Sequence, residues 1–159
     1  MKKLLLLALA GLAFTSACKK DDDNTPATMQ LSGTLSASNE KQATVVTSPA
    51  TGTVTGTYTP STKVLNYTIT FSGLSGNPTG AHLHYGDAKH NGSVWLPFAN
   101  LPAATSGTIT GTTTLTTLTS ASIPTVTSQP DSLTMGHVYA NIHTAQYPNG
   151  EIRTTVVVK

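Results

Sequence analysis

The feature of this chain that most constrains its fold is a repeated alternation of polar and apolar side chains, in which threonine is the commonest polar residue. Successive side chains of a β-strand point to opposite faces, so a period of two gives a strand one apolar and one polar face. The segment Val64–Phe71 follows this pattern, and Gly52–Thr59 precedes it across a turn signal at residues 60–63. The two segments are therefore predicted to pair as an antiparallel hairpin.

Five further segments carry similar patterns, separated by clusters of Gly, Pro, Asn and Ser: Met29–Ser36, Ala81–Tyr85, Thr108–Leu118, Gly136–His143 and Glu151–Val158. The one helical signal is a single turn at Ser128–Leu133, with Pro130 near its start and Gly136 beyond its end. The pattern indicates an all-β domain, an antiparallel β-sandwich or a Greek-key barrel. Its core is expected to include Leu35, Val54, Tyr67, Ile69, Leu115, Val138, Ala140 and Ile142.

The first 17 residues have the composition of a lipoprotein signal peptide. Two lysines precede an apolar stretch, Leu4–Phe14, which is too short to span a bilayer, and small residues lead to Cys18. This ending is similar to a bacterial lipobox, in which the cysteine carries the lipid. Because Cys18 is the only cysteine of the chain, no intramolecular disulfide is available, and lipidation is its expected role.

Residues 18–28 are predicted to be the lipidated cysteine and a flexible tether, and residues 29–159 the β domain. The charged run Lys19–Asp23 within the tether resembles the export signal of surface lipoproteins in Bacteroidetes-type bacteria, or it is a solvated spacer. Both interpretations predict a lipid-anchored protein of the cell envelope. We expect the protein to be anchored in the outer membrane, where the domain faces either the periplasm or the cell surface.

Charge is scarce, and this excludes several classes of function. Only 10% of the residues are charged, and no basic stripe is present, so nucleic-acid binding is excluded. The β domain has just four carboxylates (Glu40, Asp87, Asp131 and Glu151), few for acid–base chemistry, and no nucleophile motif. A non-enzymatic module is therefore expected.

Three of the five histidines lie in two short motifs that predict a metal site. His82 and His84 share one face of a predicted strand, and His143 shares a face with Tyr139 and Asn141 on another. If the two strands meet, the three imidazoles can bind one ion, with copper or zinc the suitable metals. His90 and His137 are expected to be exposed or in loops, although His90 is near enough in sequence to add a ligand.

A metal-free interpretation explains the same residues. Glu151 and Arg153 are two residues apart on a predicted strand and follow His143 after the tight turn at 148–150. Histidine can donate and accept hydrogen bonds in a protein interior. A structural cluster of His82, His84, His143, Glu151 and Arg153 would then hold the fold together without an ion.

The chain resembles the CHRD domain of chordin and of many exported microbial proteins. The resemblance extends from about Met29 to Val158 and is carried by the segments 38–40, 50–53, 65–69, 71–74, 81–84 and 136–153, the last of them long and specific. Lys41–Ala43 and Thr154–Thr155 depart from the usual family pattern. The resemblance implies an extracellular all-β domain that acts as a binding or structural module.

Two further interpretations concern what the domain binds. The order of His82, His84, His143 and Arg153 in the chain is also similar to that in copper-zinc superoxide dismutases, and this likeness implies copper on the histidines and an anion guided by Arg153. Alternatively, an extracellular protein or a glycan would bind an aromatic face, although such side chains commonly pack in a core. The aromatic residues of that face would be Tyr85, Trp95, Phe98 and Tyr147.

Overall fold

The computed structural model describes residues 26–116 and 128–159. The predicted signal peptide at residues 1–17, Cys18 and most of the tether lie outside the described residues, as do the last two residues of the strand predicted at Thr108–Leu118. No helix in the described part is long and apolar enough to cross a membrane.

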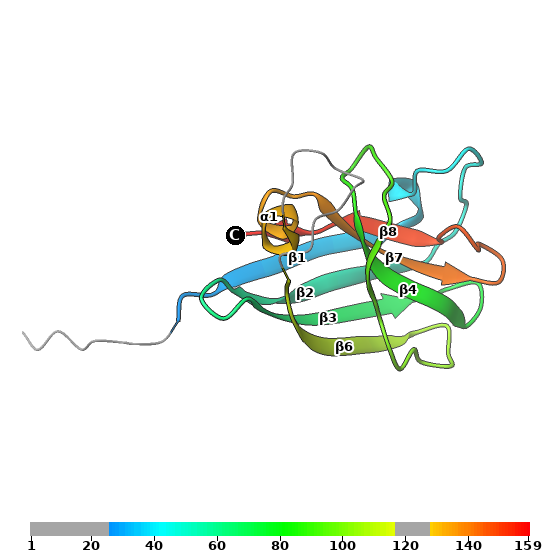
Figure 1. Cartoon of the computed structure of the whole chain (residues 1–159). Coiled ribbons are helices and arrows are strands. Elements are labelled where there is room, and N and C mark those ends of the chain that lie inside the picture. Colours follow the sequence, from blue (N-terminus) through cyan, green and yellow to red (C-terminus); the bar gives the residue numbers. More distant parts are fainter. Residues whose placement is uncertain (1–25, 117–127) are drawn as a thin grey trace, which may run out of the picture.

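The described chain forms one curled antiparallel sheet (Figure 1). Its strands are β1 (Met29–Ser36), β2 (Thr51–Thr59), β3 (Val64–Ser72), β4 (Pro78–Tyr85), β5 (Val94–Pro97), β6 (Gly107–Thr114), β7 (Val138–Thr144), β8 (Ile152–Thr155) and β9 (Val157–Val158). They are arranged in the order β5-β4-β7-β8-β1-β2-β3-β6, with β9 also paired to β1. The expected all-β antiparallel fold is confirmed.

The predicted hairpin is confirmed, with β2 and β3 paired in register from Thr51↔Ser72 to Thr59↔Val64. The C-terminal prediction needs a correction, because the single strand expected at Glu151–Val158 is divided into β8 and β9 around the buried Val156. The sequence did not predict β5, a four-residue edge strand that ends in proline. A proline is tolerated there because one edge of the strand needs no ladder hydrogen bond.

Two short helical segments complete the described chain. The 3-10 turn η1 (Ala37–Asn39) follows β1 directly. The helix α1 (Gln129–Thr134) occupies the predicted position; Ser128 caps its N-terminus by accepting from the Asp131 backbone N–H. Gly136 follows with a φ of 75°, a left-handed conformation that favours glycine and ends the helix.

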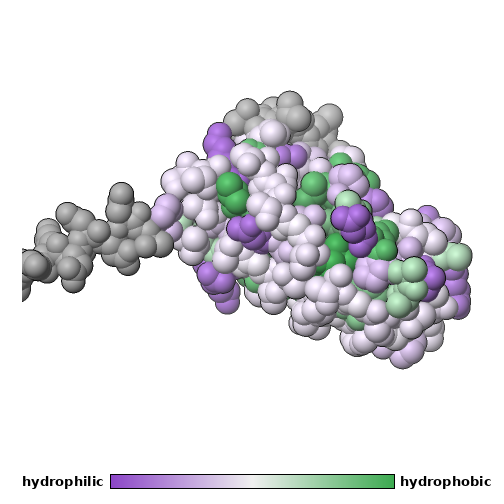
Figure 2. All heavy atoms as spheres, turned by 90° about the horizontal axis from the view of Figure 1, so that it is seen from below, coloured by the Kyte–Doolittle hydropathy of each residue, from purple (hydrophilic) through white to green (hydrophobic). Residues whose placement is uncertain are grey.

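The core lies on the concave side of the curled sheet. All eight side chains predicted for it are buried; seven lie on strands from both halves of the sheet, and Leu115 directly follows β6. The rings of Tyr67 and Phe98, whose centroids are 4.8 Å apart, bring together opposite ends of the strand order. The surface in Figure 2 is mostly pale, the intermediate hydropathy typical of threonine, serine and glycine, as expected for a chain poor in charge.

Candidate metal centre

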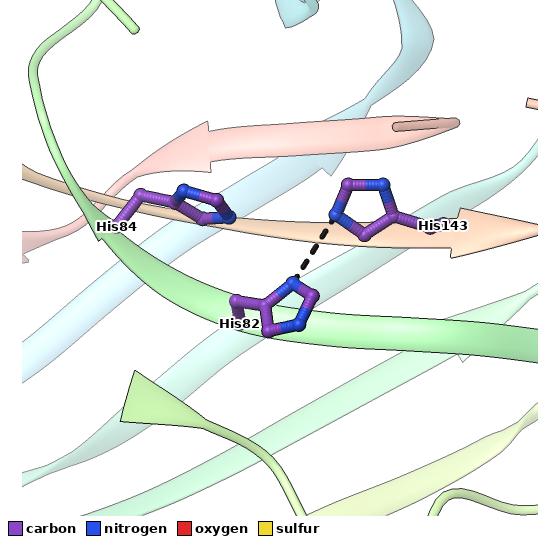
Figure 3. Close-up of side chains that lie close together, drawn as sticks. All are labelled: His82, His84 and His143. Carbon is purple, nitrogen blue, oxygen red and sulfur yellow. Dashed lines mark hydrogen bonds between the residues drawn. The ribbon is translucent and has the colours of Figure 1, made fainter. Parts of the chain in front are cut away.

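The histidine cluster is built by the pairing of β4 with β7. His82 lies opposite Asn141, His84 opposite Tyr139 and Gly80 opposite His143, so His82 and His143 are diagonal neighbours across the two strands. Figure 3 shows the three imidazoles turned toward one another. The alternation of β4 places His82 and His84 on the outer face of the sheet, opposite the buried Ala81 and Leu83. One ring nitrogen from each lies within 4.8 Å of the others, close enough for one ion.

Hydrogen bonds to the backbone fix two of the three rings. Nδ1 of His84 lies 3.0 Å from the carbonyl of Gly92, and Nδ1 of His143 lies 3.0 Å from the carbonyl of Pro148. A carbonyl only accepts, so Nδ1 of His84 carries the proton in the neutral ring, and its Nε2 keeps a free lone pair. In His143 both ring nitrogens face an acceptor oxygen, of Pro148 and of Asn141, so the neutral ring donates to one of them. The arrangement of His84 is characteristic of histidines that bind a metal through Nε2.

The Nε2 atom of His84 is the clearest sign of an unmet bonding requirement. It is buried and makes no hydrogen bond of ordinary geometry to a described residue, although the side chain of Asn141 interacts with this ring. Nε2 of His143 faces Nδ1 of His82 at 3.2 Å and Oδ1 of Asn141 at 3.1 Å. One ring nitrogen from each histidine thus lies in one region, where a cation could replace these contacts.

All three histidines are held in the neutral form that a metal requires. Burial lowers the pKa of each ring, and the neighbouring His143 and His84 lower that of His82 further, to about 4. A protonated imidazole cannot bind a metal, so depressed pKa values keep the site competent at neutral pH.

Gly80 makes room for this packing. A Cβ at this position would lie 3.1 Å from Cε1 of His82 and 3.7 Å from Cδ2 of His143. A Cβ contact of 3.1 Å is shorter than most such contacts in proteins, so the ring of His82 would have to shift. Gly80 was not among the predicted site residues, although it stands two residues before His82, on the same face of β4.

The pocket beside the cluster is small and polar. It has a volume of about 320 Å³ and is lined by residues that include Glu40, Gln42, His84, Asn141, His143 and Asn149. Glu40 contributes a carboxyl whose Oε1 is buried without a described partner. Burial raises the pKa of Glu40 to about 7, despite the opposing effect of Arg153.

Glu151, another residue of the predicted cluster, lies in a separate network. Glu151 is fully buried, and its carboxylate accepts hydrogen bonds from Ser48, Ser75 and Thr144. No hydrogen bond or ion pair joins Glu151 to a histidine within the described ranges. The predicted single His–Glu–Arg cluster is therefore not formed, because Glu151 precedes β8 and its carboxylate points toward other loops.

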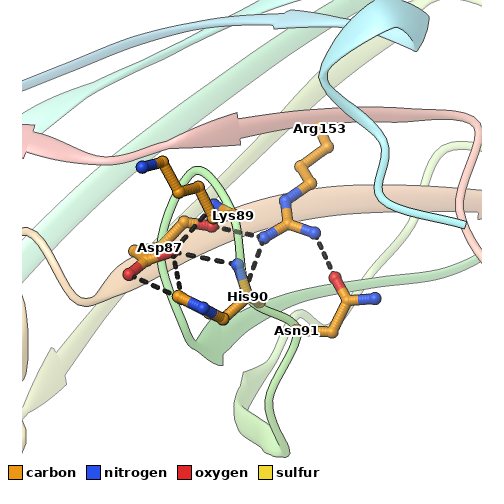
Figure 4. A network of polar contacts seen from close by, with 5 residues as sticks. All are labelled: Asp87, Lys89, His90, Asn91 and Arg153. Atoms are coloured by element: carbon orange, nitrogen blue, oxygen red, sulfur yellow. Dashed lines mark hydrogen bonds and ion pairs between the residues drawn. The ribbon is translucent and has the colours of Figure 1, made fainter.

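Arg153 organises the loop that covers the site. Its guanidinium donates to the backbone carbonyls of Asp87 and His90 and to the side chain of Asn91 (Figure 4). It is 1% exposed. The predicted role of guiding an anion from solvent does not fit a guanidinium buried in this way.

The remaining predicted residues are placed clearly. His90 is exposed and its ring pairs with Asp87, outside the metal cluster, and His137 is half-buried in the loop before β7. Tyr85, Trp95 and Phe98 are buried in the core, so the suggested aromatic binding face is wrong for these three. Tyr147 is half-buried, and its hydroxyl donates to the carbonyl of Thr47.

The comparison with protein families decides the identity of the domain. The family model of the CHRD domain matches residues 31–156, which include every strand that contributes to the site. This chain belongs to the CHRD family. Neither a curated protein nor a solved structure matches it. The CHRD domain is not known as an enzyme family, and this agrees with the expectation of a non-enzymatic module.

Proposed function

We propose that this CHRD domain is a non-enzymatic copper-binding module of the cell envelope. The ion would be held by His82, His84 and His143 on the outer face of β4 and β7. The observation that carries the proposal is the buried Nε2 of His84, which makes no hydrogen bond of ordinary geometry to a described residue while Nδ1 is fixed to the Gly92 carbonyl. A buried lone pair is costly unless a hydrogen-bond donor or a cation meets it, and a cation held by all three histidines would do so.

Copper is favoured over other ions by the type of ligand. Imidazole nitrogens suit copper and zinc, and a nitrogen site generally binds Cu²⁺ more tightly than the other divalent first-row metals. No carboxylate belongs to the cluster of potential ligands in the described chain, which argues against calcium or magnesium. Three neutral ligands leave further positions for water or a small molecule from the adjoining pocket.

The test is a copper titration of the purified protein, followed by metal analysis and thermal unfolding. Copper at 100 times its Kd should stabilise the folded state by about 2.7 kcal/mol. The triple variant His82→Ala/His84→Ala/His143→Ala should lose both the copper and the stabilisation. The matched control is His90→Ala, which removes an exposed histidine outside the cluster.

A second candidate function is a metal-free binding module in which the histidines are structural. It is favoured by the His82–His143 contact of 3.2 Å and by the two bonds to backbone carbonyls. This candidate predicts no bound copper and a loss of about 1–3 kcal/mol in His143→Ala. A melting curve unmoved by copper would favour it, and unchanged stability in His143→Ala would contradict it. Its partner would be an extracellular protein or a glycan.

Anchoring of the module is a separate part of the proposal. A lipid on Cys18 would hold the domain at the outer membrane, since acyl chains contribute about 0.8 kcal/mol for each buried methylene. Residues 18–28 would act as the tether. Cys18→Ser should release the protein into the soluble fraction and abolish incorporation of labelled fatty acid. Continued membrane association of that variant would contradict lipid anchoring.

A further inference from the structure

One aromatic ring lies between the candidate metal ligand His84 and a buried positive charge. The rings of Tyr139 and His84 are stacked, with centroids 4.7 Å apart and planes inclined by only 6°. The Cζ atom of Arg153 lies 3.5 Å from the centroid of the same tyrosine ring. His84, Tyr139 and Arg153 therefore form a continuous stack, in which Tyr139 is 3% exposed.

The charge of Arg153 is not neutralised by a close carboxylate. Its hydrogen bonds go to two backbone carbonyls and an asparagine amide. The one ion pair within 4.0 Å in the described part of the chain is His90–Asp87. Glu40 and Asp87 act on Arg153 from longer range, and Glu40 is only partly ionised at neutral pH because burial raises its pKa to about 7. The stack thus carries a net positive charge.

Arg153 also positions His84 through the loop at residues 86–93. Its guanidinium binds the loop carbonyls of Asp87 and His90, and the carbonyl of Gly92 in the same loop fixes Nδ1 of His84. Asn91 extends the link, because its amide donates to the carbonyl of Lys41. Arg153 therefore stabilises both the stack with Tyr139 and the loop whose Gly92 carbonyl orients His84.

We propose that Arg153 is a positioning residue for His84 and that its buried charge makes the site favour Cu(I) over Cu(II). The inference rests on the copper site proposed above. A fixed positive charge near a metal disfavours the more highly charged state, and its effect is greatest where water is excluded. The low exposure of Arg153, Tyr139 and His84 meets that condition.

The experiment compares Cu(I) and Cu(II) affinities of the full-length protein and its variants by competition with chromophoric chelators. Arg153→Gln removes the charge but keeps an amide donor for the loop, and Arg153→Lys keeps the charge but not the planar stack. We expect the ratio of Cu(I) to Cu(II) affinity to fall about tenfold in Arg153→Gln, equivalent to about 59 mV for a one-electron couple. In Arg153→Lys both affinities should fall while their ratio stays within about threefold.

The outcomes separate the two proposals. If the parent protein binds no copper, the proposed function fails; if it binds copper and Arg153→Gln keeps the parent ratio, the present inference alone fails. Should Arg153→Gln not fold, the ratio of Cu(I) to Cu(II) affinity is measured at pH 8 in Glu40→Gln, which removes a negative charge instead of a positive one. Removing that carboxylate leaves the guanidinium less compensated, so the Cu(I) preference should increase. An unchanged ratio in Glu40→Gln would then overturn the inference.

Discussion

Two regions of the outer sheet surface share one sequence pattern but have opposite environments. On β2, β3 and β6 the outward side chains are mainly exposed threonines, which bond across strands, as in the Thr53–Thr70 hydroxyl contact of 2.7 Å. On β7 and β8 the outward residues Tyr139, Asn141 and Arg153 are at most 3% exposed. The segments 37–50 and 86–93 lie against the second region: Asn39, Lys41 and Ala88 line a pocket with Arg153, and the loop at residues 86–93 binds its guanidinium.

This comparison shows that alternation determines which way a side chain points but not whether water reaches it. Under the loops, each polar group needs a protein partner or a bound ligand, because an unpaired buried group is costly. On the threonine face, water can replace any lost partner. Equivalent substitutions should therefore have large effects in the covered region and small ones on the threonine face.

The largest effect is expected for Glu151→Gln, at the end of the covered region. The carboxylate accepts hydrogen bonds from Ser48, Ser75 and Thr144 with no exposure to solvent. An amide cannot accept all of them, so the free energy of unfolding should fall by about 3 kcal/mol in urea denaturation at pH 7. Asp87→Asn is the matched control for loss of a more exposed carboxylate.

The same substitution has a defined dependence on pH. Burial alone would raise the pKa of Glu151, but the bonds from Ser48, Thr144 and Ser75 together hold it below its ordinary value. The folded state thus binds the proton less readily than the unfolded state. The stability contributed by Glu151 is present above the unfolded pKa, near 4.5, and is lost as the pH falls through the folded value. A difference between parent and variant that persists unchanged at pH 2 would contradict this account.

A smaller effect is expected from acid on the metal-free histidine cluster. The folded pKa values of His82, His84 and His143 lie below 6.5, so the unfolded state takes up more protons below that pH. Stability should therefore fall as the pH decreases from about 6.5 to 4, and should not vary above 6.5 on account of these groups. One proton gives a slope of about 1.4 kcal/mol per pH unit at most, and the partial exposure of His82 reduces its share.

The measurement is urea unfolding of the metal-free protein at a series of pH values. His82→Gln should have a shallower slope between pH 6.5 and 4 than the parent. Equal slopes for the parent and His82→Gln would show that the cluster does not resist protonation. The histidines would then be less closely packed than the contact distances indicate.

The sequence predicted the site best where the site residues lie on a single strand. The shared face of His82 and His84 could be predicted because alternation is a local property, and the β2–β3 hairpin followed from a short turn. Most partners of Arg153 and Glu151 could not, since they lie in loops 62 or more residues away in the chain, such as Ser48, Ser75 and Asn91. Tyr139 was placed on the correct face, but its position between His84 and Arg153 depends on strand pairing and loop closure together.

The smallest effect is expected on the threonine face, and a matched pair of substitutions tests the comparison directly. Thr53→Val and Thr144→Val each replace a hydroxyl with a methyl group on a strand. Thr53 is exposed, so water can satisfy Thr70 and the cost should be at most about 0.5 kcal/mol. Thr144 is fully buried and donates to Glu151 at 2.7 Å, so its loss should cost about 1–3 kcal/mol. Equal costs in urea denaturation would mean that loop coverage does not distinguish the two regions.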